Sequence, residues 1–177
     1  RQGVQPQDAL IASELRKAGR NIFLVVNKID GLDQASTAAQ FHELGVGDPL
    51  TISAAHGDHI SDLMDLVLAA YSETPPEDDR SDDKIPRIAV VGRPNVGKST
   101  LVNAVLGAER VIVFDEPGTT RDAVYVDFER AGKRYTLIDT AGVRRRGRVL
   151  EAVEKFSVIK TLQAVTDANV VILVLDA

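Results

Sequence analysis

The octapeptide GRPNVGKS, at residues 92–99, is the most informative part of this sequence. Its residues are, in order, Gly92, Arg93, Pro94, Asn95, Val96, Gly97, Lys98 and Ser99. The octapeptide fits the pattern G-x-x-x-x-G-K-[ST], and it lies between an expected strand and an expected helix. Such a turn directs backbone N–H groups at phosphate oxygens, and the helix N-terminus adds partial positive charge. We therefore expect a phosphate-binding loop, with Lys98 beside the β and γ phosphates and the Ser99 hydroxyl on magnesium.

Apolar segments with strand and helix periods alternate on both sides of this loop. Strands are expected at residues 21–26, 49–53, 87–91, 123–130, 134–139 and 170–175. Helices are expected at residues 6–18, 34–44, 60–71, 98–106 and 151–164. The alternation predicts an α/β fold with a mostly parallel sheet and helices on both faces. Residues 72–86 hold six acidic residues and three prolines, a composition typical of a linker.

The composition is that of a globular protein, with 44% hydrophobic residues, 27% charged residues and a formal charge of −5. The absence of cysteine excludes disulfides and thiolate metal sites and fits a cytoplasmic location. No apolar run reaches the roughly 18 residues that span a bilayer, so a membrane segment is not expected. His42, His56 and His59 form no convincing metal site and are interpreted as surface or packing residues.

Two further motifs follow the phosphate loop and resemble the moving parts of a nucleotide switch. The first is P-G-T-T-R-D at residues 117–122, in which the Thr120 hydroxyl could bind magnesium and sense the γ phosphate. A simple Pro-Gly turn is the alternative. The second comprises Asp139, Thr140, Ala141 and Gly142. We expect its carboxylate to hold magnesium through water and the amide of Gly142 to meet the γ phosphate.

A base-recognition motif of the form N-K-x-D stands early in the chain, at Asn27, Lys28 and Asp30. The Asp30 carboxylate can accept hydrogen bonds from guanine N1–H and its amino group, whereas adenine would leave this carboxylate without a partner. Asn27 is expected to brace the loop, and the Lys28 stem to cover the base. A backbone N–H at Ser53 or Ala54 could reach guanine O6. Alternatively, the N-K-x-D motif is only a polar loop that follows a strand and has no function.

The motifs together resemble the Der (EngA) family of tandem-G-domain GTPases of bacterial ribosome assembly. The segments that carry this resemblance are N-K-I-D-G-L at 27–32, S-A-A-H-G at 53–57, G-R-P-N-V-G-K-S at 92–99, P-G-T-T-R-D at 117–122, D-T-A-G-V-R-R-R-G-R at 139–148 and V-E-K-F-S-V-I-K-T-L-Q-A at 153–164. The resemblance implies a GTP- and GDP-binding, magnesium-dependent enzyme that acts on a ribosomal subunit and its RNA. It implies no DNA partner.

The order of the motifs has two possible explanations. In an internal fragment, residues 1–71 would end a first G domain and residues 87–177 would begin a second one, with residues 72–86 as the linker. The missing parts would then precede Arg1 and follow Ala177. Alternatively, the chain is a naturally circularly permuted ribosome-assembly GTPase. A fragment could also have no independent nucleotide site and act only as a docking module. The sequence leaves open whether the two parts pack into one sheet.

The resemblance also suggests how hydrolysis would proceed. Val143 follows Gly142 where Ras-like enzymes have a water-orienting glutamine, so intrinsic hydrolysis should be slow. In related GTPases an asparagine at the position of Asn95 helps to bind potassium, which adds positive charge. Lys98, Asn95, Thr120 and Gly142 are therefore the expected catalytic residues. The arginines at 144, 145, 146 and 148 could contact RNA phosphates or form a solvated basic loop.

Overall fold

A computed structural model describes residues 3–72, 85–108, 111–114, 124–139 and 156–177 of the chain. The strands are β1 (Asn21–Asn27), β2 (Leu50–Thr51), β3 (Arg87–Val91), β4 (Val111–Phe114), β5 (Val124–Arg130), β6 (Lys133–Asp139) and β7 (Val170–Asp176). The helices are α1 (Pro6–Lys17), α2 (Gln34–Ala39), the 3-10 helix η1 (Gln40–Leu44), α3 (Ile60–Ser72), α4 (Lys98–Leu106) and α5 (Phe156–Asp167).

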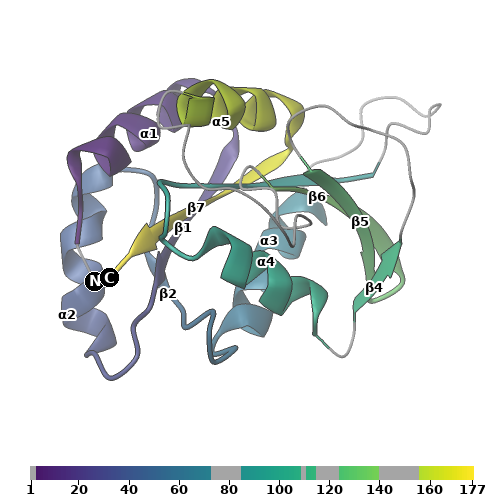
Figure 1. Cartoon of the computed structure of the whole chain (residues 1–177), viewed down its shortest axis with the longest axis horizontal. Coiled ribbons are helices and arrows are strands. Elements are labelled where there is room, and N and C mark those ends of the chain that lie inside the picture. The colour runs from purple at the N-terminus through teal and green to yellow at the C-terminus, as the bar shows by residue number, and fades with distance from the viewer. Residues whose placement is uncertain (1–2, 73–84, 109–110, 115–123, 140–155) are drawn as a thin grey trace.

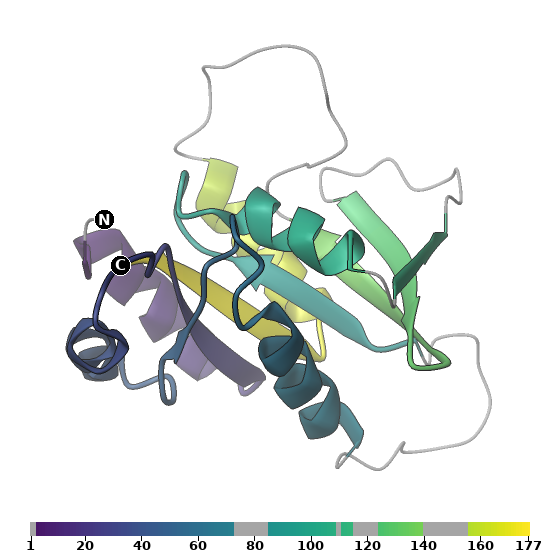
Figure 2. The ribbon, with the colours of Figure 1, turned by 90° about the horizontal axis from the view of Figure 1, so that it is seen from below.

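The described strands form one seven-stranded sheet in the order β2-β1-β7-β3-β6-β5-β4. Strands β2, β1, β7, β3 and β6 run parallel to one another, whereas β5 is antiparallel to β6 and β4 is antiparallel to β5. The centre of the sheet joins the two parts of the chain, because β1 pairs with β7 from Asn21↔Val170 to Asn27↔Asp176. Figure 2 shows β7, in yellow, between β1 and β3. The two parts of the chain, which the sequence alone does not place relative to each other, therefore form one continuous sheet.

Helices cover both faces of this sheet (Figure 1). Helices α1, η1 and α5 pack on one face, and α3 and α4 pack on the other. Each face of the sheet has its own hydrophobic core, and successive residues of β1 point to the two cores alternately. Leu24 and Val26 belong to the core under α1, η1 and α5, and Val25 belongs to the core under α3 and α4. A parallel strand buried on both faces needs such a continuous apolar run. The α/β class with a mostly parallel sheet and helices on both faces is confirmed.

Several elements differ in extent from the expectation. The expected helix at 34–44 divides into α2 and η1, and Gly45, in a left-handed conformation (φ 60), ends it. The expected strand at 49–53 is reduced to β2. Strand β4 was missed. It is an edge strand that pairs only with β5 among the described strands, and Ile112 and Val113 are exposed, so the segment lacks the buried apolar pattern of a central strand.

Parts of several expected segments fall outside the described residues. The linker at 72–86 lies mostly there, and so do the first five residues of the helix expected at 151–164, which is described from Phe156 to Asp167. In the described part of the chain, helices are too short or too polar to cross a membrane.

Candidate nucleotide-binding site

The octapeptide forms a curled loop between the carboxyl end of β3 and the start of α4. Gly92 and Gly97 have positive φ angles of 146° and 101°. A Cβ atom at Gly92 would lie 2.3 Å from the carbonyl oxygen of Val174, and one at Gly97 would lie 2.2 Å from Nδ2 of Asn27. Both positions therefore require glycine for conformational freedom and for close approach.

The side chain of Lys98 lies inside this loop. It is 8% exposed, and its ammonium donates to the carbonyl oxygens of Gly92, at 2.8 Å, and Arg93, at 2.7 Å. The loop therefore fixes a positive charge against its own backbone. A charge at this position is suited to phosphate oxygens.

The side chain of Arg93 leaves the loop and contacts helix α1. Its Nε donates to both carboxylate oxygens of Asp8 at 3.1 Å, and both residues are buried. Burial raises the pKa of Asp8, and this effect is opposed by hydrogen bonds from the Gln5 N–H and Arg93. The contact joins residues 85 positions apart, one from each part of the chain. The Arg93 side chain thus anchors the loop to α1, and the expected nucleotide contact of Arg93 stays a prediction.

Asn27 connects the phosphate loop to both base segments. It is 2% exposed at the end of β1. Its Nδ2 donates to the carbonyl oxygen of Val96 at 2.9 Å, and its Oδ1 accepts from the Ala54 N–H at 3.0 Å. Lys28 makes a second link, since its ammonium donates to the Asn95 carbonyl and to Asp176 Oδ2, both at 2.9 Å. The structure thus brings together these residues from segments far apart in the sequence.

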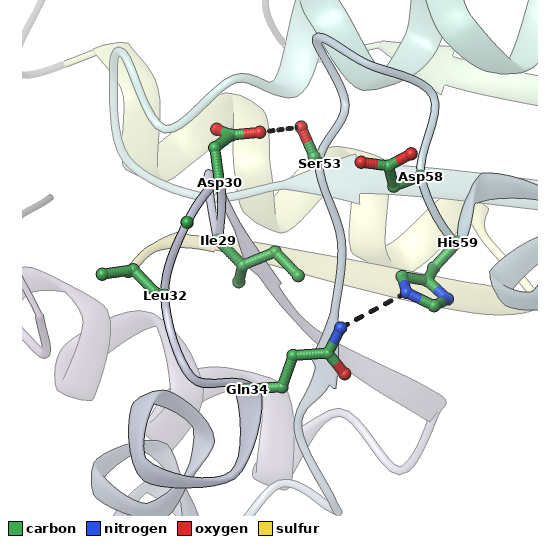
Figure 3. A pocket seen from close by; sticks show the side chains of 8 residues that line it. Ile29, Asp30, Leu32, Gln34, Ser53, Asp58 and His59 are labelled. Carbon is green, nitrogen blue, oxygen red and sulfur yellow. Dashed lines mark hydrogen bonds between the residues drawn. The ribbon is translucent and has the colours of Figure 1, made fainter.

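Asp30 is one of the residues that line a pocket of about 300 Å³, which are Ile29, Asp30, Gly31, Leu32, Gln34, Ser53, Asp58 and His59. Figure 3 shows Asp30 facing Ser53 across one side of the pocket, and Gln34 facing His59 across the other. The Ser53 hydroxyl donates to Asp30, and this bond chiefly lowers the pKa of that carboxyl. A carboxylate held in this way is ready to accept further donors.

His56 is a contact of the base motif that sequence reasoning missed. Its Nδ1 lies 2.7 Å from Asp30 Oδ1 and 2.9 Å from Ser53 Oγ. The histidine was interpreted as a surface or packing residue, and it is indeed 66% exposed. The sequence did contain a signal for this contact, because His56 follows Ser53 by three residues, a spacing at which a turn brings two side chains together.

The remaining expected residues are described only in part. Asp139 ends β6, and its backbone pairs with Val90 of β3, the strand that leads into the phosphate loop. Ser99 lies in the first turn of α4. Pro94 is exposed in the loop. The other residues, Thr120, Thr140, Ala141, Gly142, Val143 and the arginines at 144, 145, 146 and 148, lie outside the described residues.

Comparison with known proteins gives close matches. The whole chain is 65% identical to GTPase Der of Thiobacillus denitrificans and covers 37% of that protein. It is 62% identical, again along its whole length, to GTPase Der of Aromatoleum aromaticum and covers 40% of that protein. The chain thus spans about 40% of the length of such relatives. The solved G domain of the T. maritima FeoB iron transporter is 30% identical over 52% of this chain and 56% of its own, with a TM-score of 0.32.

A family model supplies the assignment. The model described as 50S ribosome-binding GTPase matches residues 87–177, just over half of the chain. This segment contains the phosphate loop, strand β3 and helix α4. The chain therefore belongs to the 50S ribosome-binding GTPase family.

Proposed function

We propose that this chain binds GTP and GDP in one site assembled from its two parts and hydrolyses GTP there. One observation carries the proposal. Asn27 of the base motif donates to Val96 of the phosphate loop and accepts from Ala54 of the second base segment. Because Asn27 is buried, these two hydrogen bonds fix the distance between the phosphate end and the base end of the site.

The phosphate end supplies charge neutralisation. Lys98 and the loop amides bind the β and γ phosphates, with the helix N-terminus behind them. Magnesium, when bound, neutralises charge that develops on the phosphates during hydrolysis. The Ser99 and Thr120 hydroxyls and, through water, the Asp139 carboxylate would hold it, since these are the hard oxygen ligands that magnesium prefers. The pairing of Val90 with Asp139, which brings β6 alongside the strand that leads into the loop, supports this set.

The base end supplies selectivity. Asp30 accepts from guanine N1–H and from its amino group, and the Lys28 stem covers the base. The N–H groups of Ser53 and Ala54, expected from the sequence to reach guanine O6, already donate to the Asp58 carbonyl oxygen and to Asn27 Oδ1, so they are assigned no O6 contact. The hydrogen bond from Ser53 to Asp30 supports this role, since it favours the ionised carboxylate that guanine requires. Adenine presents no matching donors and would leave the carboxylate desolvated, which disfavours ATP.

Hydrolysis by this site is proposed to be slow and stimulated by potassium. The side chain of Val143 can neither donate a hydrogen bond to water nor accept one, and Asn95 would help to hold the monovalent ion. Asn95 is exposed in the loop with φ 64, so its side chain is accessible to a bound ion. Hydrolysis by the whole chain should be faster in potassium than in sodium, and equal rates in the two salts would contradict the role of Asn95.

The biological role follows from the relatives rather than from the site. We propose that residues 1–71 and 87–177 derive from two tandem G domains of one parent, with residues 72–86 as their linker. The parent would act in the cytoplasm on the large ribosomal subunit and its RNA. The relatives named GTPase Der, which are much longer than this chain, and the family description support this role.

The decisive experiment is titration of the chain with a fluorescent GTP analogue in magnesium and potassium, with GTP and ATP as competitors. Displacement by GTP at concentrations at least about 100-fold below those of ATP is expected. Asp30→Asn should weaken GTP binding and favour xanthosine triphosphate, because the new amide donates to the xanthine oxygen. Weak or unselective binding by the unaltered chain would overturn the composite site and leave a docking module.

A further inference from the structure

The contact between His56 and Asp30 has no part in the function proposed so far. Asp30 follows β1, whereas Ser53 and His56 lie between β2 and α3. The two loops meet where Asp30 Oδ1, Ser53 Oγ and His56 Nδ1 approach one another, with His56 Nδ1 2.7 Å from the carboxylate and 2.9 Å from the hydroxyl. These distances are within hydrogen-bond range.

The backbone around His56 is fixed by a turn that folds back on Ser53. The N–H groups of His56, Gly57 and Asp58 all donate to the Ser53 carbonyl oxygen, at 3.2, 2.8 and 3.1 Å. The Ser53 N–H donates in return to the Asp58 carbonyl oxygen at 3.2 Å. The side chain of His56 is therefore exposed, but its backbone is held by these hydrogen bonds. The position of the Cα atom, from which the ring projects, is thus well defined.

Donor and acceptor chemistry fixes the proton of this contact. An ionised carboxylate only accepts hydrogen bonds, and the single hydroxyl proton of Ser53 is donated to Asp30. An unprotonated Nδ1 would then face a carboxylate oxygen lone pair at 2.7 Å. Nδ1 of His56 therefore carries a hydrogen and donates it to Asp30. This donor is present in the cationic ring and in one neutral tautomer.

Two donors thus converge on one oxygen of the carboxylate that reads the base. Their directions restrict the rotation of the carboxyl group, and a group that is already oriented loses less entropy when a ligand binds. They also favour the ionised form of Asp30. Loss of either donor should leave the phosphate end of the site unchanged, because Lys98 is held by Gly92 and Arg93 instead.

We propose that His56 is a positioning residue for guanine recognition: its Nδ1–H holds the Asp30 carboxylate in the orientation that accepts the guanine edge. His56 thereby sets the selectivity for guanine over adenine and not the affinity for phosphates. This inference rests on the proposed guanine-binding function of the site.

The test uses the whole chain and the variants His56→Ala and His56→Asn. Asparagine places an amide N–H near the former Nδ1 and should restore the contact. The control is His42→Ala, since His42 is also an exposed histidine and lies 3.7 Å from Asp48 instead of Asp30. Two quantities are measured: the pKa of the Asp30 carboxyl by NMR in nucleotide-free protein, and the dissociation constants of GTP, ATP and inorganic triphosphate.

His56→Ala should raise the Asp30 pKa and weaken GTP binding by roughly fivefold, with ATP and triphosphate binding unchanged. His56→Asn should recover most of both effects, and His42→Ala should change neither. If the Asp30 pKa, or the ratio of the ATP and GTP dissociation constants, is unchanged in His56→Ala, the positioning role of His56 is wrong. The proposed GTP-binding function would not be affected by that result. Tighter GTP binding in that variant would make His56 a competitor of guanine. Failure of the unaltered chain to bind GTP, even with a shifted Asp30 pKa, would instead overturn the proposed function.

Discussion

The phosphate loop, residues 92–99, and the base motif, residues 27–30, meet at Asn27 but are stabilised by different kinds of contact. The loop depends on backbone: two glycines leave no space for a Cβ atom, and buried Lys98 is held by main-chain carbonyls. Asp30 of the base motif is held by two side chains, those of buried Ser53 and exposed His56. We infer that the loop tolerates almost no added volume, whereas the Asp30 side chain can be altered without loss of the fold.

The strongest way to break this contrast is Gly97→Ala. The new Cβ would lie 2.2 Å from Nδ2 of Asn27, at a φ of 101° that L-residues rarely adopt. Backbone strain and overpacking together should lower the free energy of unfolding by about 4 kcal/mol. Urea unfolding of the whole chain measures this difference.

The matched control for that variant is Gly132→Ala. Gly132 also has a positive φ, 75°, but no other group lies within 4 Å of a Cβ atom built there. It should cost only about 1 kcal/mol, the backbone cost alone. Equal losses of unfolding free energy in the two variants would mean that the close approach of Asn27 to Gly97 adds no cost beyond that of the backbone.

The next largest effect is expected from Asp8→Asn. The change removes the buried carboxylate that Arg93 contacts through two hydrogen bonds, and it leaves a buried guanidinium without that anion. Breaking a buried ion pair in this way should lower the free energy of unfolding by about 3 kcal/mol. Chemical unfolding measures the loss.

Glu14→Gln on the same helix is the control for Asp8→Asn. It removes the carboxylate from an ion pair with Lys17, whose side chain is 69% exposed, so a loss below about 0.5 kcal/mol is expected. A loss as small in Asp8→Asn would show that the Arg93 contact does not join α1 to the loop.

The same contrast explains what could be predicted from the sequence. The phosphate loop and the N-K-x-D motif are local patterns in which backbone conformation and residue type coincide, so the sequence alone identifies both. The apolar runs of β1 and β7 were also recognised as strands, but such a run does not specify its neighbour. Their pairing, from Asn21↔Val170 to Asn27↔Asp176, was therefore left open.

Side-chain contacts across long sequence separations were the least predictable. Asp8 and Arg93 are 85 residues apart, and each has an ordinary local explanation, one in the first turn of a helix and the other in a glycine-rich loop. Their burial follows only from the packing of α1 beside β3's loop. His56 and Asp30 present the same difficulty on a smaller scale, because turn geometry brings the ring to the carboxylate.

The smallest expected effect concerns the base motif. It is the contribution of Asp30 to the stability of the fold at low pH. The hydrogen bond from Ser53 lowers the pKa of this carboxyl below its ordinary value of 3.8, and His56 adds to that effect. Because the folded-state pKa is depressed, Asp30 stabilises the fold above pH 3.8, and this contribution is lost as pH falls through the folded-state pKa. Ser53→Ala should raise that pKa and make the acid-dependent loss smaller. Melting temperatures from about pH 6 to about pH 2.5 measure the difference, and in an Asp30→Asn background Ser53→Ala should no longer alter the pH profile. If it still did, the acid sensitivity would arise from carboxyls other than Asp30.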